Sequence, residues 1–138
     1  MQFAQICDLV AIDTASMEPI DLSSFPGTWI NSNPETNGIA RLLMSESDGN
    51  LSLQTLAVGP TGLIDWGRTG VDVFTSGPSS RLAAGFSSRY DFDFVEIRLQ
   101  GMIMKGLLVL AQFHRFKDDS RRADHFAREY YAQIHGRY

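Results

Sequence analysis

The 138-residue chain has few of the residues that mark metal-binding and disulfide-stabilised proteins. Its single cysteine, Cys7, excludes an internal disulfide and any site built from several cysteines. The three histidines, His114, His125 and His135, are too scattered to form a local metal-binding motif. The sequence signatures of serine hydrolases, metalloproteases and phosphate-binding loops are also missing. We therefore expect no metal and no cofactor, and we do not expect a stand-alone hydrolase or metalloenzyme.

The N-terminal region and the apolar segments also lack targeting features. Residues 1–26 contain no lysine or arginine, whereas secretory signals and transit peptides carry positive charge. The longest apolar stretch, residues 101–113, is interrupted by Lys105 and Gln112 and is shorter than the roughly 20 residues that span a bilayer. A net charge of −4 provides no general attraction to nucleic acid or to anionic membranes. We expect a cytoplasmic protein with no membrane insertion and no nucleic-acid partner.

What the sequence does contain is a series of short apolar segments separated by turn residues. Turn signals such as Asp48-Gly49-Asn50 recur between residues 27 and 116, and all five prolines lie outside the proposed strand interiors. This pattern predicts an all-β fold, an antiparallel up-and-down β-barrel of seven or eight strands. The predicted strands cover residues 28–32, 39–47, 51–58, 65–75, 81–89, 90–100 and 104–116.

The C-terminal region shows a different pattern. Residues 107–111 are apolar on both faces of a strand and therefore need cover on both sides. After candidate N-cap residues at 118–120, apolar side chains fall on one helical stripe, at Ala123, Phe126, Ala127, Tyr130 and Ile134. We predict a helix over residues 119–135, packed on the outside of the barrel. The chain would then form a single domain, with an N-terminal segment (1–26), a barrel (27–116) and this helix.

The first predicted strand opens with Gly27-Thr28-Trp29, and Arg115 lies near the end of the last one. This arrangement resembles the Gly-x-Trp signature of the lipocalins, which belong to the calycin superfamily. The resemblance implies that Trp29 sits at the closed end of a lipocalin-like barrel. It also implies that Arg115 packs across Trp29 in a cation–π contact, worth roughly 0.5–2 kcal/mol, which closes the barrel. A barrel of this type is a cup for small apolar molecules.

The phase of the alternating pattern in residues 90–100 leaves two interpretations open. Either Glu96 and Arg98 share the inner face with Phe92 and Phe94, or a bulge near Val95 turns both charged side chains to water. In an apolar lumen, burial would raise the pKa of Glu96, which could then act as a general acid or base. Glu96 and Arg98 are therefore the candidate catalytic residues.

Further polar and aromatic residues are candidates for lining a cavity. Asp65-Trp66-Gly67-Arg68 fits the rim of a cup, or else the start of a strand with a buried indole and solvated charges. The candidate ligand-binding residues are Arg41, Trp66, Arg68, Tyr90, Phe92 and Phe94.

Three functions fit these observations. The first is binding of a small hydrophobic or amphipathic molecule in the barrel cavity. The second is a cofactor-free cyclase or isomerase that holds a natural-product intermediate in a reactive conformation in the same cavity. The third is a non-enzymatic protein-interaction module with a filled barrel, whose partner is another protein or a second copy in a homodimer. A lumen packed with side chains would favour the third.

Overall fold

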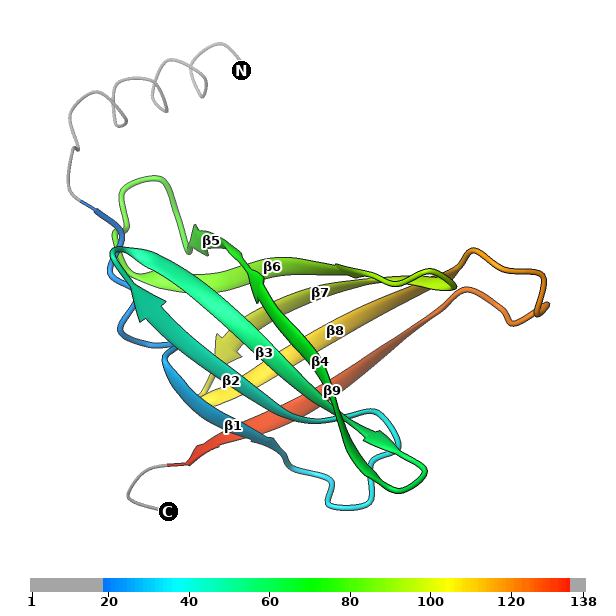
Figure 1. Ribbon diagram of the computed structural model, residues 1–138. Helices are drawn as coiled ribbons and strands as arrows, with labels where there is room; N and C mark the ends of the chain where they lie inside the picture. The colour runs from blue at the N-terminus through cyan, green and yellow to red at the C-terminus, as the bar shows by residue number, and fades with distance from the viewer. Residues whose placement is uncertain (1–18, 135–138) are drawn as a thin grey trace, which may run out of the picture.

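The computed structural model describes residues 19–134, and within this range the regular structure is one antiparallel sheet of nine strands (Figure 1). The strands lie in the order β4-β3-β2-β1-β9-β8-β7-β6-β5. Most neighbours in the sheet are therefore also neighbours in the chain, as in a meander. The strands are β1 (Gly27–Asn31), β2 (Ile39–Ser47), β3 (Asn50–Gly59), β4 (Gly62–Gly70), β5 (Asp72–Thr75), β6 (Ala83–Asp91), β7 (Val95–Met104), β8 (Leu107–Phe116) and β9 (His125–Ile134).

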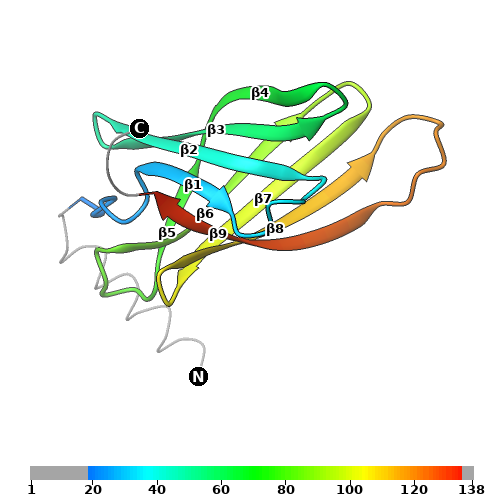
Figure 2. The ribbon, with the colours of Figure 1, turned by 90° about the horizontal axis from the view of Figure 1, so that it is seen from below.

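The sheet is strongly curled into an open half-barrel (Figures 1 and 2). Its two edge strands, β4 and β5, follow each other in the chain and are separated only by Val71. Side chains of β6 form hydrogen bonds with the backbone of β4 across the curled sheet. The Tyr90 hydroxyl donates to the Gly67 carbonyl oxygen at 2.7 Å, and the Ser88 hydroxyl donates to that of Gly70 at 3.1 Å. Side-chain hydrogen bonds hold this side of the half-barrel together.

The inner face of the sheet is packed with apolar side chains over most of its length. Alternate residues of a strand point to opposite faces, so Ile97 and Leu99 of β7 are buried while Arg98 is exposed between them. Burying this face removes a large apolar surface from water, which is the main driving force for folding. The largest fully buried side chains on it include Trp29, Tyr131, Ile39, Leu42, Leu53 and Leu99.

One end of the half-barrel is covered by the segment that precedes β1. Phe25 is completely buried, and its ring meets Phe86 edge-on at 5.6 Å between centroids. The indole nitrogen of Trp29 donates to the Phe25 carbonyl oxygen at 2.9 Å. Asp21 pairs with Leu82 in an isolated bridge that fixes the segment beside β6. We call this the closed end. The opposite end carries the β1–β2, β3–β4, β6–β7 and β8–β9 connections and is called the open end.

The predicted C-terminal helix is wrong, because residues 125–134 form strand β9 in the middle of the sheet. β9 pairs with β8 on one side and with β1 on the other. Phe126, Tyr130 and Ile134 are spaced by four residues, and this spacing places side chains on one face of a helix and also on one face of a strand. Pairing on both sides satisfies the backbone of β9, so the strand is formed. β9 covers the edge of β8, not its outer face.

Two other predictions need correction. The predicted strand 65–75 is two strands, β4 and β5, separated at Val71, where the chain passes from one edge of the sheet to the other. The predicted strand 90–100 contains a turn, in which the Phe92 amide donates to the Val95 carbonyl oxygen at 2.9 Å. This turn explains the phase change in the apolar pattern. The sheet therefore has nine strands and stays open, whereas a closed barrel of seven or eight was predicted. The helix or strand considered near the N-terminus lies outside the described residues.

Candidate functional site

A cleft of about 480 Å³ opens on the inner face at the open end, between β2, β3 and β4 on one side and β8 and β9 on the other. Its apolar lining comes mainly from Ile39, Ala57, Ile64 and Trp66. The polar lining comes from the β1–β2 connection and from inward-facing residues of β8 and β9, among them Thr36, Gln112, His114, His125 and Glu129. Core side chains fill the rest of the inner face, and this cleft is the space that they leave unfilled at the open end of the curled sheet.

Glu129 is the centre of a hydrogen-bonded network in the cleft. Its Oε2 accepts from Asn31 Nδ2 at 2.9 Å and from the Thr36 hydroxyl at 2.6 Å. Its Oε1 accepts from Gln112 Nε2 at 3.2 Å. Asn31 and Gln112 are almost completely buried, so their amide groups need partners. The network therefore fixes the position of the carboxylate through donors from β1, the β1–β2 connection and β8.

Two histidines lie side by side next to this network. His114 and His125 face each other across β8 and β9, and their rings are stacked at 4.6 Å between centroids. His114 Nε2 lies 3.4 Å from Gln112 Oε1. Burial lowers the pKa of His114, and the charge of a protonated His125 lowers it further. His114 is therefore neutral at pH 7.

The hydrogen bonds that link Glu129, Gln112 and His114 also determine the tautomer of His114. A carboxylate only accepts, so Gln112 directs its NH2 group to Glu129 and its oxygen to His114. The amide oxygen only accepts as well, so His114 Nε2 carries the hydrogen. Nδ1 of the neutral ring is then an acceptor, and it has no hydrogen-bond partner among residues 19–134. His114 lines the cleft, and Nδ1 is the acceptor that its ring leaves unused.

Below the network, Tyr131 is completely buried and its hydroxyl donates to the Ile39 carbonyl oxygen at 2.8 Å. Burial raises the pKa of this phenol, and the nearby charge of Glu129 raises it further. Tyr131 therefore stays protonated and joins β9 to β2 as a structural donor.

Three of the predicted ligand-binding residues form one aromatic cluster. Trp66 meets Tyr90 edge-on at 5.4 Å and Phe92 edge-on at 5.6 Å, while Tyr90 and Phe92 are stacked at 5.8 Å. Of the three, Trp66 lines the cleft. Burial raises the pKa of Tyr90, and its hydroxyl also lies 3.1 Å from that of Thr55. Tyr90 and Phe92 thus pack against the indole of Trp66 without lining the cleft themselves.

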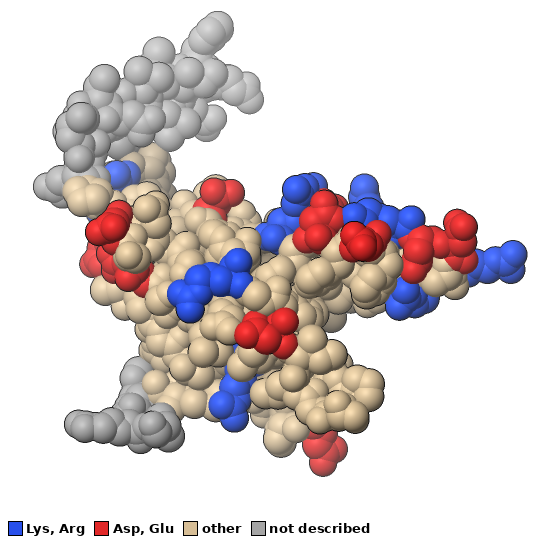
Figure 3. Space-filling model, viewed as in Figure 1, with Lys and Arg blue, Asp and Glu red and all other residues tan. Residues whose placement is uncertain are grey.

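The other predicted ligand-binding residues lie away from the cleft. Arg41 of β2 and Arg68 of β4 are exposed, and Arg68 Nη1 donates to the Ser45 hydroxyl at 3.0 Å. Phe94 lies in the β6–β7 turn, with the guanidinium of Arg122 at 5.3 Å from its ring centroid. Figure 3 shows charged side chains of both signs gathered over this turn and the β8–β9 connection.

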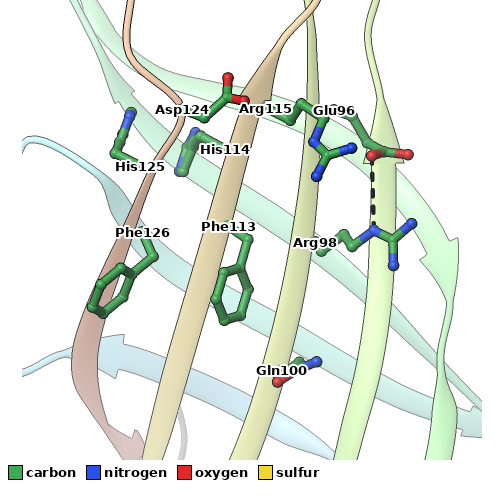
Figure 4. Close-up of a pocket in the computed structure, with 9 residues that line it drawn as sticks. All are labelled: Glu96, Arg98, Gln100, Phe113, His114, Arg115, Asp124, His125 and Phe126. Carbon is green, nitrogen blue, oxygen red and sulfur yellow. Dashed lines mark ion pairs between the residues drawn. The ribbon is translucent and has the colours of Figure 1, made fainter.

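The candidate catalytic pair also lies elsewhere. Glu96 and Arg98 are on the outer face of β7, where Glu96 contacts Arg89 at 3.0 Å and Arg98 Nε at 3.7 Å. They line a different hollow together with Arg115 (Figure 4). Arg115 is paired in register with Glu96 at the open end, whereas Trp29 lies at the closed end. The structure therefore places Arg115 and Trp29 at opposite ends, and the cation–π closure does not form.

The polar residues of the cleft were not identified from the sequence as candidate site residues. His125 and Glu129 fall in the region that was predicted as a helix. The predicted helix hid the fact that both share one face of β9 with Ala127 and Tyr131. With β9 recognised as a strand, the inward-facing Gln112 and His114 of β8 come to lie beside them. Residues 125–131 show no strict alternation of polar and apolar side chains, so the sequence contains no clear signal for this strand.

Within residues 19–134, no cluster of three or more histidine, cysteine or acidic side chains has the geometry of a metal site. None of the described chain forms a helix that is long and apolar enough to cross a membrane. Comparison of the sequence with protein-family models and curated proteins, and of the fold with solved structures, finds no match.

Proposed function

We propose that the protein binds a small amphipathic molecule in the cleft at the open end. The observation that carries this proposal is the position of Trp66 in the same cleft as the Glu129, Gln112 and His114 network. The indole offers a flat apolar surface, and the network offers oriented polar groups. Small-molecule sites commonly combine an apolar wall with a few fixed polar groups in a hollow of about 300–1,000 Å³.

The network also indicates the chemistry of the ligand. Both oxygens of Glu129 already accept hydrogen bonds, whereas Nδ1 of the neutral His114 is an unused acceptor. A ligand with a hydroxyl group would donate to this nitrogen. A flat apolar molecule with a hydroxyl group is therefore the class that we propose.

Isothermal titration calorimetry with 2-naphthol tests this proposal. Trp66→Leu should weaken binding about tenfold, which corresponds to roughly 1.4 kcal/mol. Phe74→Leu is the matched control, because Phe74 is an exposed aromatic residue outside the cleft. 2-Methoxynaphthalene, which lacks the donor, should bind more weakly than 2-naphthol. Equal affinities for the two compounds, or equal effects of the two substitutions, would contradict the proposal.

The calycin interpretation belongs to this proposal. Support comes from the antiparallel, curled sheet and from Trp29, which is buried near the start of β1 at the closed end. Arg115 gives no support, because it lies at the other end. The resemblance is therefore carried by Gly27-Thr28-Trp29 and by the order of the strands.

The packed inner face favours a second candidate, a protein-interaction module. Side chains such as Leu53, Leu99 and Leu110 fill the half-barrel below the cleft. The filled part of the sheet would then serve as a scaffold for an outer surface. Sedimentation velocity over a range of concentrations distinguishes a self-associating module from a monomeric binding protein.

Catalysis by a cyclase or isomerase depends on the same cleft, and His114 is the group that favours it. A neutral imidazole with a free nitrogen can accept a proton from a bound substrate. Native mass spectrometry of protein from its own host tests this role. If His114 accepts a proton from the substrate, the His114→Gln variant should not convert the substrate. It should therefore retain bound substrate, whereas the unmodified protein converts the substrate and releases the product.

A further inference from the structure

The outer face of β7, β8 and β9 carries exposed aromatic side chains in a regular lattice. The register places Arg98, Phe113 and Phe126 in one row across the three strands. Phe126 is 68% exposed and Phe113 is 41% exposed. Met102 and Tyr130, also exposed, extend the apolar surface along the same strands. Clustered apolar side chains on a surface are typical of a binding site.

The two phenylalanine rings form the floor of a hollow of about 530 Å³. Their centroids are 6.1 Å apart, and their planes differ by 27°. Figure 4 shows both rings side by side, with Gln100 on the neighbouring strand. This arrangement offers a flat apolar area wide enough for an aromatic ligand.

Two arginines lie at one end of this floor. Arg98 is paired directly opposite Phe113, and Arg115 is two residues further along β8. Glu96 accepts from Arg89 at 3.0 Å, while its contact with Arg98 is longer, 3.7 Å, and uses only Nε. Arg115 has no ion pair or hydrogen bond from its side chain to any residue in the range 19–134. Both guanidinium groups therefore have free donors at the hollow.

The carboxylates of the hollow already have partners. Glu96 is held by the arginines on β6 and β7, and Asp124 Oδ1 accepts from the Phe116 amide at 2.9 Å. The chain as a whole has a net charge of −4, so attraction of an anion to the hollow depends on these two guanidinium groups. Guanidinium groups bind oxyanions such as carboxylate and phosphate through paired hydrogen bonds.

We propose that this hollow binds a small aromatic anion, with its ring system on Phe113 and Phe126 and its carboxylate, sulfonate or phosphate group on Arg98 and Arg115. The floor of the hollow is on the outer face of the sheet, and His114 and His125 line both the hollow and the cleft. The ligand of the hollow differs from that of the cleft, because two guanidinium groups line the hollow, whereas no arginine or lysine of the described residues lines the cleft.

Calorimetry with two probes of the same shape tests the site. Naphthalene-2-sulfonate is an anion, and naphthalene-2-sulfonamide is its neutral counterpart. At low salt, the sulfonate should bind about tenfold more tightly, and this preference should shrink as salt screens the charges. Phe126→Ser should weaken binding of both probes, since it removes part of the apolar floor.

The double variant Arg98→Gln/Arg115→Gln should abolish the preference for the sulfonate. Arg41→Gln/Arg68→Gln makes the same change in net charge at exposed arginines outside the hollow and should retain the preference. Trp66→Leu should leave sulfonate binding unchanged, so failure of this proposal and failure of the cleft proposal give different results.

Three results would overturn the proposal. The first is equal affinity for the sulfonate and the sulfonamide. The second is equal loss of preference in the two double-arginine variants. The third is a dimer in sedimentation velocity that Phe126→Ser converts to a monomer, because the exposed rings would then belong to an interface between two copies of the chain.

Discussion

The two tryptophans lie in opposite regions of the half-barrel and differ in their surroundings. Trp29, at the closed end, is 2% exposed, packs in the apolar core and donates its indole hydrogen to Phe25. Trp66, near the open end, is half-buried and lines a cleft that also contains Glu129 and His114. Packing holds the closed end, whereas a polar network with an unused acceptor organises the open end. The closed end therefore contributes packing to stability, and the open end is where we propose that the ligand binds.

The largest expected effect is at the closed end. Phe25→Ala removes a completely buried ring and should lower the free energy of unfolding by about 3–5 kcal/mol. Binding of 2-naphthol by the folded fraction should not change, because Phe25 does not line the cleft. Urea denaturation and calorimetry measure the two effects. Phe74→Ala, at an exposed position, is the control and should change stability by less than about 0.5 kcal/mol. Equal losses of stability in both variants would contradict this account.

An intermediate effect is expected at the open end. Glu129→Leu leaves the donors of Asn31, Thr36 and Gln112 without their acceptor, so stability should fall by about 1–3 kcal/mol. Because the network orients His114, this variant should also weaken 2-naphthol binding, unlike Phe25→Ala. Glu129→Gln retains an acceptor oxygen and should cost less stability. An unchanged affinity in Glu129→Leu would show that the network does not support the site.

The smallest effect is a pH dependence. A histidine in an unfolded chain titrates near 6.5, and burial places the pKa of His114 in the folded protein below this value. As the pH falls through 6.5, the unfolded chain takes up a proton before the folded protein does. Stability is therefore greatest above this range and decreases as the pH falls from about 7.5 to 5.5. His114→Gln should have a shallower decrease, measured by urea denaturation at each pH. The same slope in both proteins would exclude this role of His114.

The sheet itself was largely predictable from alternation and turn residues. Strand β2 has the predicted bounds, because its apolar alternation lies between two clear turn signals. β9 was not predictable in the same way, since Phe126, Tyr130 and Ile134 fit a helix and a strand equally well. Its partner β1 lies about a hundred residues earlier in the chain, so only the tertiary pairing distinguishes the two.

The same error limited the prediction of the site. Trp66, Tyr90 and Phe92 were recognised as aromatic candidates, and they form one cluster, of which Trp66 lines the cleft. For Glu96 and Arg98 the sequence left two interpretations open, an inner face shared with Phe92 or an irregularity near Val95 that turns both to water. The turn between β6 and β7 reverses the phase and places both on the outer face. The polar half of the cleft depends on β9, so it was hidden by the predicted helix.

The most direct measurement compares the two tryptophans in one experiment. The ligand is 6-bromo-2-naphthol, whose bromine quenches indole fluorescence at short range. Trp29→Phe leaves Trp66 as the only tryptophan, and Trp66→Phe leaves Trp29. The account predicts saturable quenching of Trp66 and no saturable quenching of Trp29. Quenching of Trp29 alone, or equal weak quenching of both, would contradict a binding site at the open end.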